Sequence, residues 1–297
     1  MSNIVSVIKD YSIRFNERIK PLFVKADGVE RRVVDAMEYS VMNGGKRLRP
    51  FLVYETANIF GIDFDTSFDV AASLEMLHSY SLIHDDLPAM DNDDLRRGKP
   101  TCHKYFDEAT AILAGDGLLT YAFEVLANSS YKDATKVELV KILSQAAGAF
   151  NGMIAGQMLD LSSEKMNNIS NPVQIINHIE EMKTGRLLRY ACESGAVIGN
   201  ATEAEKKSLV DYSRKIGIAF QISDDILDVE GNEEIVGKTL NKDKEQNKLT
   251  FVGCYGVDKA KIMAQDLIDD AKEIVSVFGA SSVNLQNLAD FIVERNY

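Results

Sequence analysis

The sequence predicts an all-α fold, a single-domain helical bundle of about ten or more helices. Apolar residues recur at helical spacing from the start: Ile4, Ile8, Tyr11 and Phe15 lie four, three and four residues apart, which places them on one face of a helix. Only five prolines occur, and none follows Pro172, so nothing in the second half forces a helix to break. Segments that alternate apolar and polar residues between turn signals are scarce, which argues against a β-sheet.

Helices are expected in ten segments, whose ranges are 3–20, 30–43, 50–60, 68–86, 104–128, 134–163, 172–199, 203–230, 258–278 and 283–295. Pro50 suits the first turn of the third helix, and Asn171 followed by Pro172 is typical of a helix N-terminus. The connections are short except for 87–103 and 231–249, which are rich in charged residues and glycine. No low-complexity linker divides the chain, so we expect one domain over residues 1–297.

The composition limits the class of protein. Of the 297 residues 45% are hydrophobic and 26% charged, which fits a large core. The net charge of −12 argues against binding to nucleic acid. Three widely spaced cysteines, without Cys-x-x-Cys spacing, argue against a disulfide scaffold or a zinc ribbon. No signal peptide pattern occurs and no apolar run approaches about 18 residues, so we expect a cytoplasmic protein with no membrane span.

A short acidic motif occurs twice. Residues 83–87 read Ile-His-Asp-Asp-Leu and residues 222–226 read Ile-Ser-Asp-Asp-Ile, and each motif closes an apolar helical stretch. Paired carboxylates in such a place repel one another unless a cation meets them. A hard divalent cation with oxygen ligands, above all Mg²⁺ with substrate phosphates, is the common solution. One such pair taken alone is more simply read as a helix end in water, but two matched motifs favour a metal site.

The third acid of each motif is placed differently. Asp228 follows Asp224 by four residues, so both carboxylates lie on one helical face. Asp91 follows Asp85 by six residues with Pro88 between them. The helix must therefore end or kink near residue 87, and Asp91 must return from the turn.

Basic residues gather in two short segments in spite of the net negative charge, namely Lys46, Arg47 and Arg49, and then Arg96, Arg97 and Lys99. The first group follows an Asn-Gly-Gly turn and precedes the helix that Pro50 opens, an arrangement suited to phosphate. The second follows the first acidic motif directly. Cations beside a metal site indicate an anionic ligand such as a diphosphate, although a solvated charged face is the simpler reading of each run alone.

The sequence was compared with the patterns of two other kinds of metal site. The segment from Asp91 is similar to a calcium-binding EF-hand loop, but Arg96 stands where that loop needs glycine. Glu75 and His78 match one Glu-x-x-His of a di-iron bundle, but no second such motif occurs. His78 lies two helical turns before Asp85, so it either points toward the same site or packs in the core.

Several motifs in order resemble the trans-type isoprenyl diphosphate synthases. They are Gly-Gly-Lys-Arg-Leu-Arg-Pro at 44–50, the segment from His78 to Asp91 with the Leu-Arg-Arg-Gly at 95–98, Gly-Gln-x-x-Asp at 156–160, Lys-Thr-Gly at 183–185, Phe-Gln-x-x-Asp-Asp-x-x-Asp at 220–228, Gly-Lys at 237–238 and Lys-Leu-Thr at 248–250. Within that family the chain is most similar to the bacterial farnesyl diphosphate synthases (geranyltranstransferases). It departs from the family at Arg186, where a small residue is expected, and at the terminal Tyr297, where lysine is usual.

The resemblance implies a fold of helices around a central cavity and a role for each matching residue. The metal ligands that it implies, for three Mg²⁺ ions, are Asp85, Asp86, Asp91, Asp224, Asp225 and Asp228. The residues implied for the diphosphate of isopentenyl diphosphate are Lys46, Arg49, His78 and Arg97. The residues implied for the allylic diphosphate are Arg96, Lys183, Thr184, Gln221 and Lys238, of which Lys183, Thr184 and Gln221 would be catalytic. Gln157 and Asp160 would support the wall behind them.

The implied reaction agrees with these residue types. Breaking an allylic C–O bond creates a carbocation and a diphosphate together, and metal ions stabilise the negative charge on the leaving oxygen. Oxygen dipoles in a dry cavity stabilise the cation until the isopentenyl double bond attacks it. No Ser-His or Cys-His pattern of a side-chain nucleophile is found in the sequence.

The expected product is farnesyl diphosphate. Tyr80 and Ser81 lie four to five residues before Asp85, which is about 6–7.5 Å along a helix. By analogy with the family, a bulky Tyr80 would form a floor that stops elongation, whereas ordinary core packing is the alternative reading. The other functions considered are a geranylgeranyl diphosphate synthase, a terpene cyclase and a non-catalytic subunit of a prenyl synthase. The resemblance also suggests a homodimer.

Overall fold

The computed structural model describes residues 3–24, 27–163, 170–231 and 249–295. In these residues the chain is helical almost throughout, with one two-stranded antiparallel hairpin of β1 (Leu95–Arg96) and β2 (Lys99–Pro100). The all-α prediction is therefore confirmed. The hairpin lies in the charged segment 87–103 and was not predicted, because two-residue strands show no alternation.

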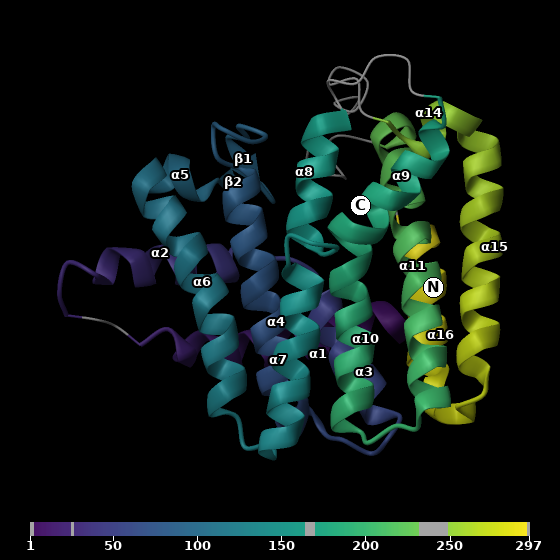
Figure 1. Cartoon of the computed structure of the whole chain (residues 1–297), viewed down its shortest axis with the longest axis horizontal. Coiled ribbons are helices and arrows are strands. Elements are labelled where there is room, and N and C mark those ends of the chain that lie inside the picture. The colour runs from purple at the N-terminus through teal and green to yellow at the C-terminus, as the bar shows by residue number, and fades with distance from the viewer. Residues whose placement is uncertain (1–2, 25–26, 164–169, 232–248, 296–297) are drawn as a thin grey trace.

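The helices follow one another along the chain in the order shown in Figure 1. Those of the first half are α1 (Asn3–Ile19), η1 (Lys20–Leu22), α2 (Arg31–Met42), α3 (Leu48–Asn58), α4 (Phe64–Asp85), α5 (Cys102–Tyr105), α6 (Glu108–Asn128) and α7 (Asp133–Ala147). Those of the second half are α8 (Met153–Ser163), α9 (Pro172–Glu180), the π-helical segment η2 (Glu181–Gly185), α10 (Arg186–Ile198), α11 (Glu203–Glu230), α14 (Phe251–Tyr255), α15 (Val257–Ser276), η3 (Gly279–Ser282) and α16 (Val283–Glu294).

Two expected helices differ from the structure, one by a break and one by a change of helix type. The range 134–163 is wrong as one helix, because the chain turns between α7 and α8 at residues 148–152. A Cβ at Gly152 would lie 2.5 Å from the carbonyl oxygen of Gln145, so the turn packs backbone against backbone and depends on glycine. The range expected as one helix over 172–199 is helical from Pro172 to Ile198, but residues 181–185 widen into a π-helix, a feature that is often found at functional sites.

Helix starts were the least accurate boundaries. The helix α4 begins at Phe64 and not at residue 68, because the side chain of Asp63 accepts a hydrogen bond of 2.8 Å from the amide of Thr66. The expected helix 104–128 begins at Glu108, where Asp107 caps Thr110 in the same way. The short helix α14 was not predicted. The start of α11 matches its prediction, and Thr202 and Glu205 form a complete capping box there.

The long helices α4 and α11 organise the bundle. α4 packs on α3 and α6, and α11 packs on α10 and α15. The C-terminal ends of α4 and α11 lie at the same end of the molecule, the upper end in Figure 1. Both acidic motifs stand at these ends, so the fold brings the two motifs to one end of the bundle.

One described helix, α6, is long and apolar enough to cross a membrane, although the sequence was expected to contain no such segment. α6 packs against α2 and α4, and 44% of its apolar window is buried. Core helices commonly have this length and composition, so we interpret α6 as a core helix.

Candidate active site

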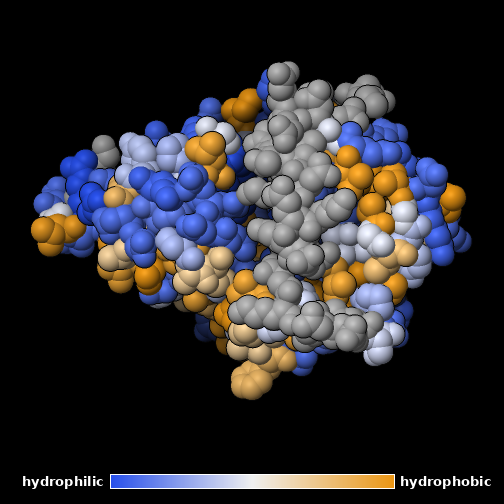
Figure 2. Space-filling model, turned by 90° about the horizontal axis from the view of Figure 1, so that it is seen from above, coloured by the Kyte–Doolittle hydropathy of each residue, from blue (hydrophilic) through white to orange (hydrophobic). Residues whose placement is uncertain are grey.

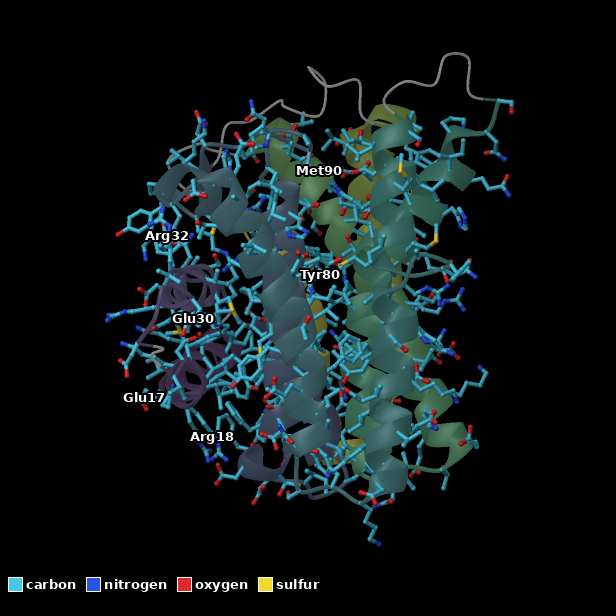
Figure 3. The ribbon with its side chains drawn as sticks, turned by 60° about the vertical axis from the view of Figure 1, so that its left-hand side comes forward. Glu17, Arg18, Glu30, Arg32, Tyr80 and Met90 are labelled. Atoms are coloured by element: carbon cyan, nitrogen blue, oxygen red, sulfur yellow. The ribbon has the colours of Figure 1, made fainter. Side chains whose placement is uncertain are left out.

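A cavity of about 430 Å³ lies between α4, α8, η2 and the start of α10. The residues singled out in the sequence that line it are Arg49, His78, Tyr80, Ser81, Asp85, Gln157, Lys183 and Thr184. In Figure 3, Tyr80 lies deeper along α4 than Met90, between α4 and the helices of the C-terminal half. The cavity therefore has a charged mouth and continues along α4 away from the acidic motif.

The apolar lining was not found in the sequence. It consists of Leu82, Met90, Met153, Ile154, Met158, Leu161 and Leu187. The residues at 154, 158 and 161 are four and three apart, which is one helical face. That spacing was an available signal, but it does not distinguish a cavity wall from an ordinary core face.

The first acidic motif is enclosed and crowded. Burial raises the pKa of Asp85 to about 6; the charge of Lys183 opposes this rise, and nearby Asp91 and Asp86 add to it. The turn after α4 carries the chain back, and the amide of Asp91 donates a hydrogen bond of 2.9 Å to the carbonyl oxygen of Asp85. The predicted return of Asp91 is thus seen in the backbone.

Asp86 is already paired. It is 3% exposed, and Arg96 Nε lies 2.8 Å from both of its oxygens while Nη2 lies 2.5 Å from Oδ1. Burial raises the pKa of Asp86, and the bond from Arg96 opposes the rise. The hairpin that carries Arg96 is therefore bonded to the end of α4. The surface of this part of the molecule is mostly hydrophilic (Figure 2).

The three acids of the second motif have different surroundings. Asp224 accepts a hydrogen bond of 2.6 Å from Arg295, which follows α16. Asp225 is 2% exposed and accepts bonds from Gln221 Nε2 at 3.0 Å and from the amide of Phe251 at 2.7 Å. Asp228 is also buried. Asp225 thus holds the N-terminus of α14, a structural task that the sequence did not indicate.

The π-helical segment lies between the two motifs. Lys183 Nζ donates to Asp160 at 2.5 Å, and the negative charges of Asp160 and Asp85 raise the pKa of Lys183 against the effect of burial. Thr184 donates to Glu180 at 3.2 Å. Burial raises the pKa of Glu180 to about 8, and the charge of Asp225 adds to the rise. Glu180 was not singled out in the sequence, because a lone glutamate on a helix carries no pattern.

The cations expected at the second diphosphate lie together. Arg49 Nη1 lies 3.4 Å from His78 Nε2. Burial and the charges of Arg49 and Arg97 hold the pKa of His78 well below its usual range, so this imidazole is neutral. Burial also lowers the pKa of Lys46 to about 8, and the charge of Arg295 adds to this effect. Like charges collected in a buried place are typical of an anion site.

Not every expected contact forms. Gln221 is bonded to Asp225 and is not part of the cavity lining, so it does not face the cavity as expected. Lys238 lies outside the described residues. In the described part of the chain, no group of three or more His, Cys, Asp or Glu side chains is arranged to hold a metal ion.

The donor set nevertheless suits magnesium. Carboxylate oxygens are the ligands that Mg²⁺ prefers, and burial together with the neighbouring Asp91 and Asp86 raises the pKa of Asp85, so a bound cation would favour its ionised form. Asp86 and Asp224 are each bonded to an arginine here. A metal bound at these oxygens would have to displace the arginines or share the carboxylates with them.

Comparison with known proteins places the chain in a family. The polyprenyl synthetase family model matches residues 30–278. The farnesyl diphosphate synthase of Micrococcus luteus is 44% identical over 93% of this chain and 93% of its own, and that of Escherichia coli K12 is 43% identical over 89% of each. A solved FPP/GFPP synthase of Zymomonas mobilis matches with a TM-score of 0.88 and 36% identity over 98% of this chain and 99% of its own. The chain belongs to the polyprenyl synthetase family.

Proposed function

We propose that the protein is a trans-prenyltransferase that condenses isopentenyl diphosphate with dimethylallyl or geranyl diphosphate and depends on Mg²⁺. The observation that carries the proposal is the cavity in which Asp85, Lys183 and Thr184 stand at the mouth and an apolar wall follows α4 inward. An anionic head group fits the charged end and a prenyl chain fits the apolar end. The likeness to farnesyl diphosphate synthases over most of the chain supports the same reaction.

The allylic diphosphate would be held between the two acidic motifs. The six aspartates at 85, 86, 91, 224, 225 and 228 would hold three Mg²⁺ ions, and bound Mg²⁺ would supply positive charge for the leaving diphosphate. Arg96 and Lys183 would add cationic contacts, as would Lys238. The side chains of Arg96 and Lys183 lie at the first motif, since Arg96 is bonded to Asp86 and the charge of Lys183 acts on the pKa of Asp85.

Side-chain oxygen atoms of the protein would stabilise the carbocation. The hydroxyl of Thr184 stands on the π-helical segment at the cavity, and the oxygen of Gln221 would have to turn from Asp225 to contribute. Methionine and leucine side chains line the rest of the cavity and exclude water, which would otherwise capture the cation. The departed diphosphate would accept the final proton.

Isopentenyl diphosphate would bind the other group of cations. Lys46 would contribute to this group together with Arg49 and Arg97. The two arginines lie near a neutral His78, which keeps one ring nitrogen as a hydrogen-bond donor and one as an acceptor. Arg49 and His78 line the cavity that also contains Asp85. The double bond of the bound substrate would then reach the allylic carbon without leaving the cavity.

Farnesyl diphosphate is the proposed product. Tyr80 lines the cavity below the acidic motif, and its ring lies edge-on to His84 with centroids 5.2 Å apart. A rigid aromatic side chain there would stop elongation. The second candidate is geranylgeranyl diphosphate, because a synthase of that product from Cyanophora paradoxa is 42% identical over 89% of this chain.

A single domain and a cytoplasmic homodimer are part of the same proposal. Large apolar side chains are exposed on α6 and on the 148–152 turn, among them Ile112, Leu113 and Phe150. Burial of such a face against a second copy would remove apolar area from water.

The test is turnover of the purified protein. We expect isopentenyl and geranyl diphosphates with Mg²⁺ to give farnesyl diphosphate, and no product when a chelator replaces the metal. Chromatography of the products distinguishes the two candidate lengths. Failure of both allylic substrates to react with Mg²⁺ present would overturn the proposal.

A further inference from the structure

A buried ion pair joins α4 to the start of α3. Arg47 Nη1 donates to the carboxylate of Glu75. The side chain of Arg47 is 0% exposed and that of Glu75 is 3% exposed. A pair so fully removed from water gains little net stability, because desolvation offsets most of the attraction. Its presence beside the cation cluster therefore calls for another explanation than stability.

Arg47 cannot bind a substrate. Its Nε donates to Asn16 at 2.8 Å, its Nη2 donates to the carbonyl oxygen of Val41 at 2.6 Å, and its Nη1 is held by Glu75. Each guanidinium nitrogen is thus bonded inside the protein. The basic segment 46–49 contains one arginine that points into the fold between Lys46 and Arg49, which are proposed to bind diphosphate.

The backbone at Arg47 is also unusual. Its φ is 53°, in the left-handed region that non-glycine residues seldom adopt. Gly44 and Gly45 just before it have φ values of 93° and 111°. The bonds of Arg47 hold a turn that is unfavourable by itself, and this turn sets the direction of the side chains on either side of it.

Glu75 also acts on the substrate cations. It lies one helical turn before His78 on α4. Burial lowers the pKa of Arg49 and of Arg97, and the charge of Glu75 opposes both shifts. The carboxylate therefore serves as a counter-charge for a group of arginines that would otherwise repel one another while no substrate is bound.

We propose that Glu75 and Arg47 form a positioning pair for the isopentenyl diphosphate subsite, in which the pair fixes the 44–49 turn and keeps Lys46, Arg49 and Arg97 assembled before the substrate arrives. The inference rests on the proposed function for the identity of the ligand. Preorganised cations bind an anion without first having to be ordered, so loss of the pair weakens binding of isopentenyl diphosphate and leaves the allylic site intact.

Three variants test the pair. Glu75→Gln removes the counter-charge and leaves Arg47 buried alone, a change that also lowers stability. The double variant with both residues changed to Met removes both charges, so its melting temperature is expected to return close to that of the wild type. The matched control is Glu55→Gln on α3, which changes a carboxylate that is 2% exposed and bonded to Asn284.

The readouts are the KM for each substrate, kcat and the Kd of isopentenyl diphosphate measured by calorimetry without the allylic partner. We expect both Glu75→Gln and the double variant to raise the KM and the Kd for isopentenyl diphosphate about tenfold, which corresponds to the loss of one charge-assisted contact. The KM for geranyl diphosphate is expected to change less than about twofold, as are all constants of the control.

The outcomes separate the two proposals. If the double variant recovers both its melting temperature and its wild-type KM and Kd, the pair is merely structural and the inference is wrong. If the wild type binds isopentenyl diphosphate but forms no product, the proposed function is wrong, and the Kd values still decide the role of the pair. If the wild type neither binds nor reacts, both proposals are overturned.

Discussion

The carboxylate of Asp224 lies 2.6 Å from Nη2 of Arg295, so the C-terminal end of the chain is bonded to the second acidic motif. Arg295 also donates to the carbonyl oxygen of Phe220 at 3.0 Å, and its guanidinium lies 3.8 Å above the ring of that residue. A side-chain cation thus occupies one oxygen that the proposed function assigns to a metal ion.

Removal of this competing cation is expected to ease metal binding. Arg295→Gln frees Asp224, and a partly exposed ion pair contributes about 1 kcal/mol, so the Mg²⁺ concentration for half-maximal rate is expected to fall about fivefold. The measurement is a Mg²⁺ titration of the rate. Lys272→Gln breaks a comparable pair with Asp290 between α15 and α16 and serves as the control. A higher Mg²⁺ requirement in Arg295→Gln would show that the arginine assists the metal and does not compete with it.

The carboxylate of Asp85 is expected to lower the free energy of unfolding of the metal-free protein and to be required for a high kcat. Its pKa is raised from 3.8 to about 6, so above pH 6 the folded protein contains an ionised group that burial disfavours. Asp85→Asn is expected to lower kcat by about 10³-fold through loss of a metal ligand, and to stabilise the metal-free protein at pH 8 by on the order of 2 kcal/mol. Thermal unfolding with a chelator measures the second effect. Asp116→Asn, a change to an exposed acid of α6, is the control, and an unaltered kcat in Asp85→Asn would refute the metal-ligand role.

Glu55 gives the stability a pH dependence of its own. Burial raises its pKa from 4.5 to about 7. Between these two values the folded state holds a proton that the unfolded state releases, so the free energy of unfolding falls as the pH rises from about 4.5 to 7 and then levels off. Glu55→Gln is therefore expected to match the wild type near pH 4 and to exceed it by about 3 kcal/mol at pH 8.

Denaturant unfolding across that pH range is the measurement for Glu55. The exposed Glu17→Gln on α1 removes the same charge from the surface and should leave the pH profile unchanged. Parallel profiles of Glu55→Gln and the wild type would mean that the carboxyl is not the titrating group.

The length of the product should depend on Tyr80. Tyr80→Ala opens the apolar end of the cavity, so we expect a share of the product to extend beyond fifteen carbons. Gas chromatography of the dephosphorylated products measures the distribution. Tyr121→Ala removes an aromatic ring from α6 that contacts Phe23 and does not line the cavity. An unchanged product distribution in Tyr80→Ala would assign this side chain to ordinary core packing.

The fold class was predictable because helical spacing is local. The stripe from Ile4 to Phe15 is buried as expected, and Asn171 caps the start of α9 as predicted. The break between α7 and α8 was missed because it depends on the close backbone contact at Gly152, which only the folded chain creates.

The candidate site was predictable in its residues but not in its bonding. The motifs identified Asp85, Lys183 and Thr184, which line one cavity. The spacing of four residues allows Gln221 to bond Asp225 on α11, but it does not show that Gln221 makes this bond instead of facing the cavity. The pairing of Glu75 with Arg47 depends on the distance between α4 and the start of α3, which no spacing along the chain records. Glu180 was missed because a lone glutamate carries no pattern, and the apolar wall because its spacing is also that of an ordinary core face.

The most direct test of the two-motif site is a count of bound metal ions. Mn²⁺ replaces Mg²⁺ in such sites and can be counted by electron paramagnetic resonance in the presence of inorganic diphosphate. We predict three ions per chain for the wild type, one fewer for Asp224→Asn and at most one for Asp85→Asn, because the metal ions at both motifs are expected to bind the same diphosphate. Unchanged counts in both variants would contradict the account.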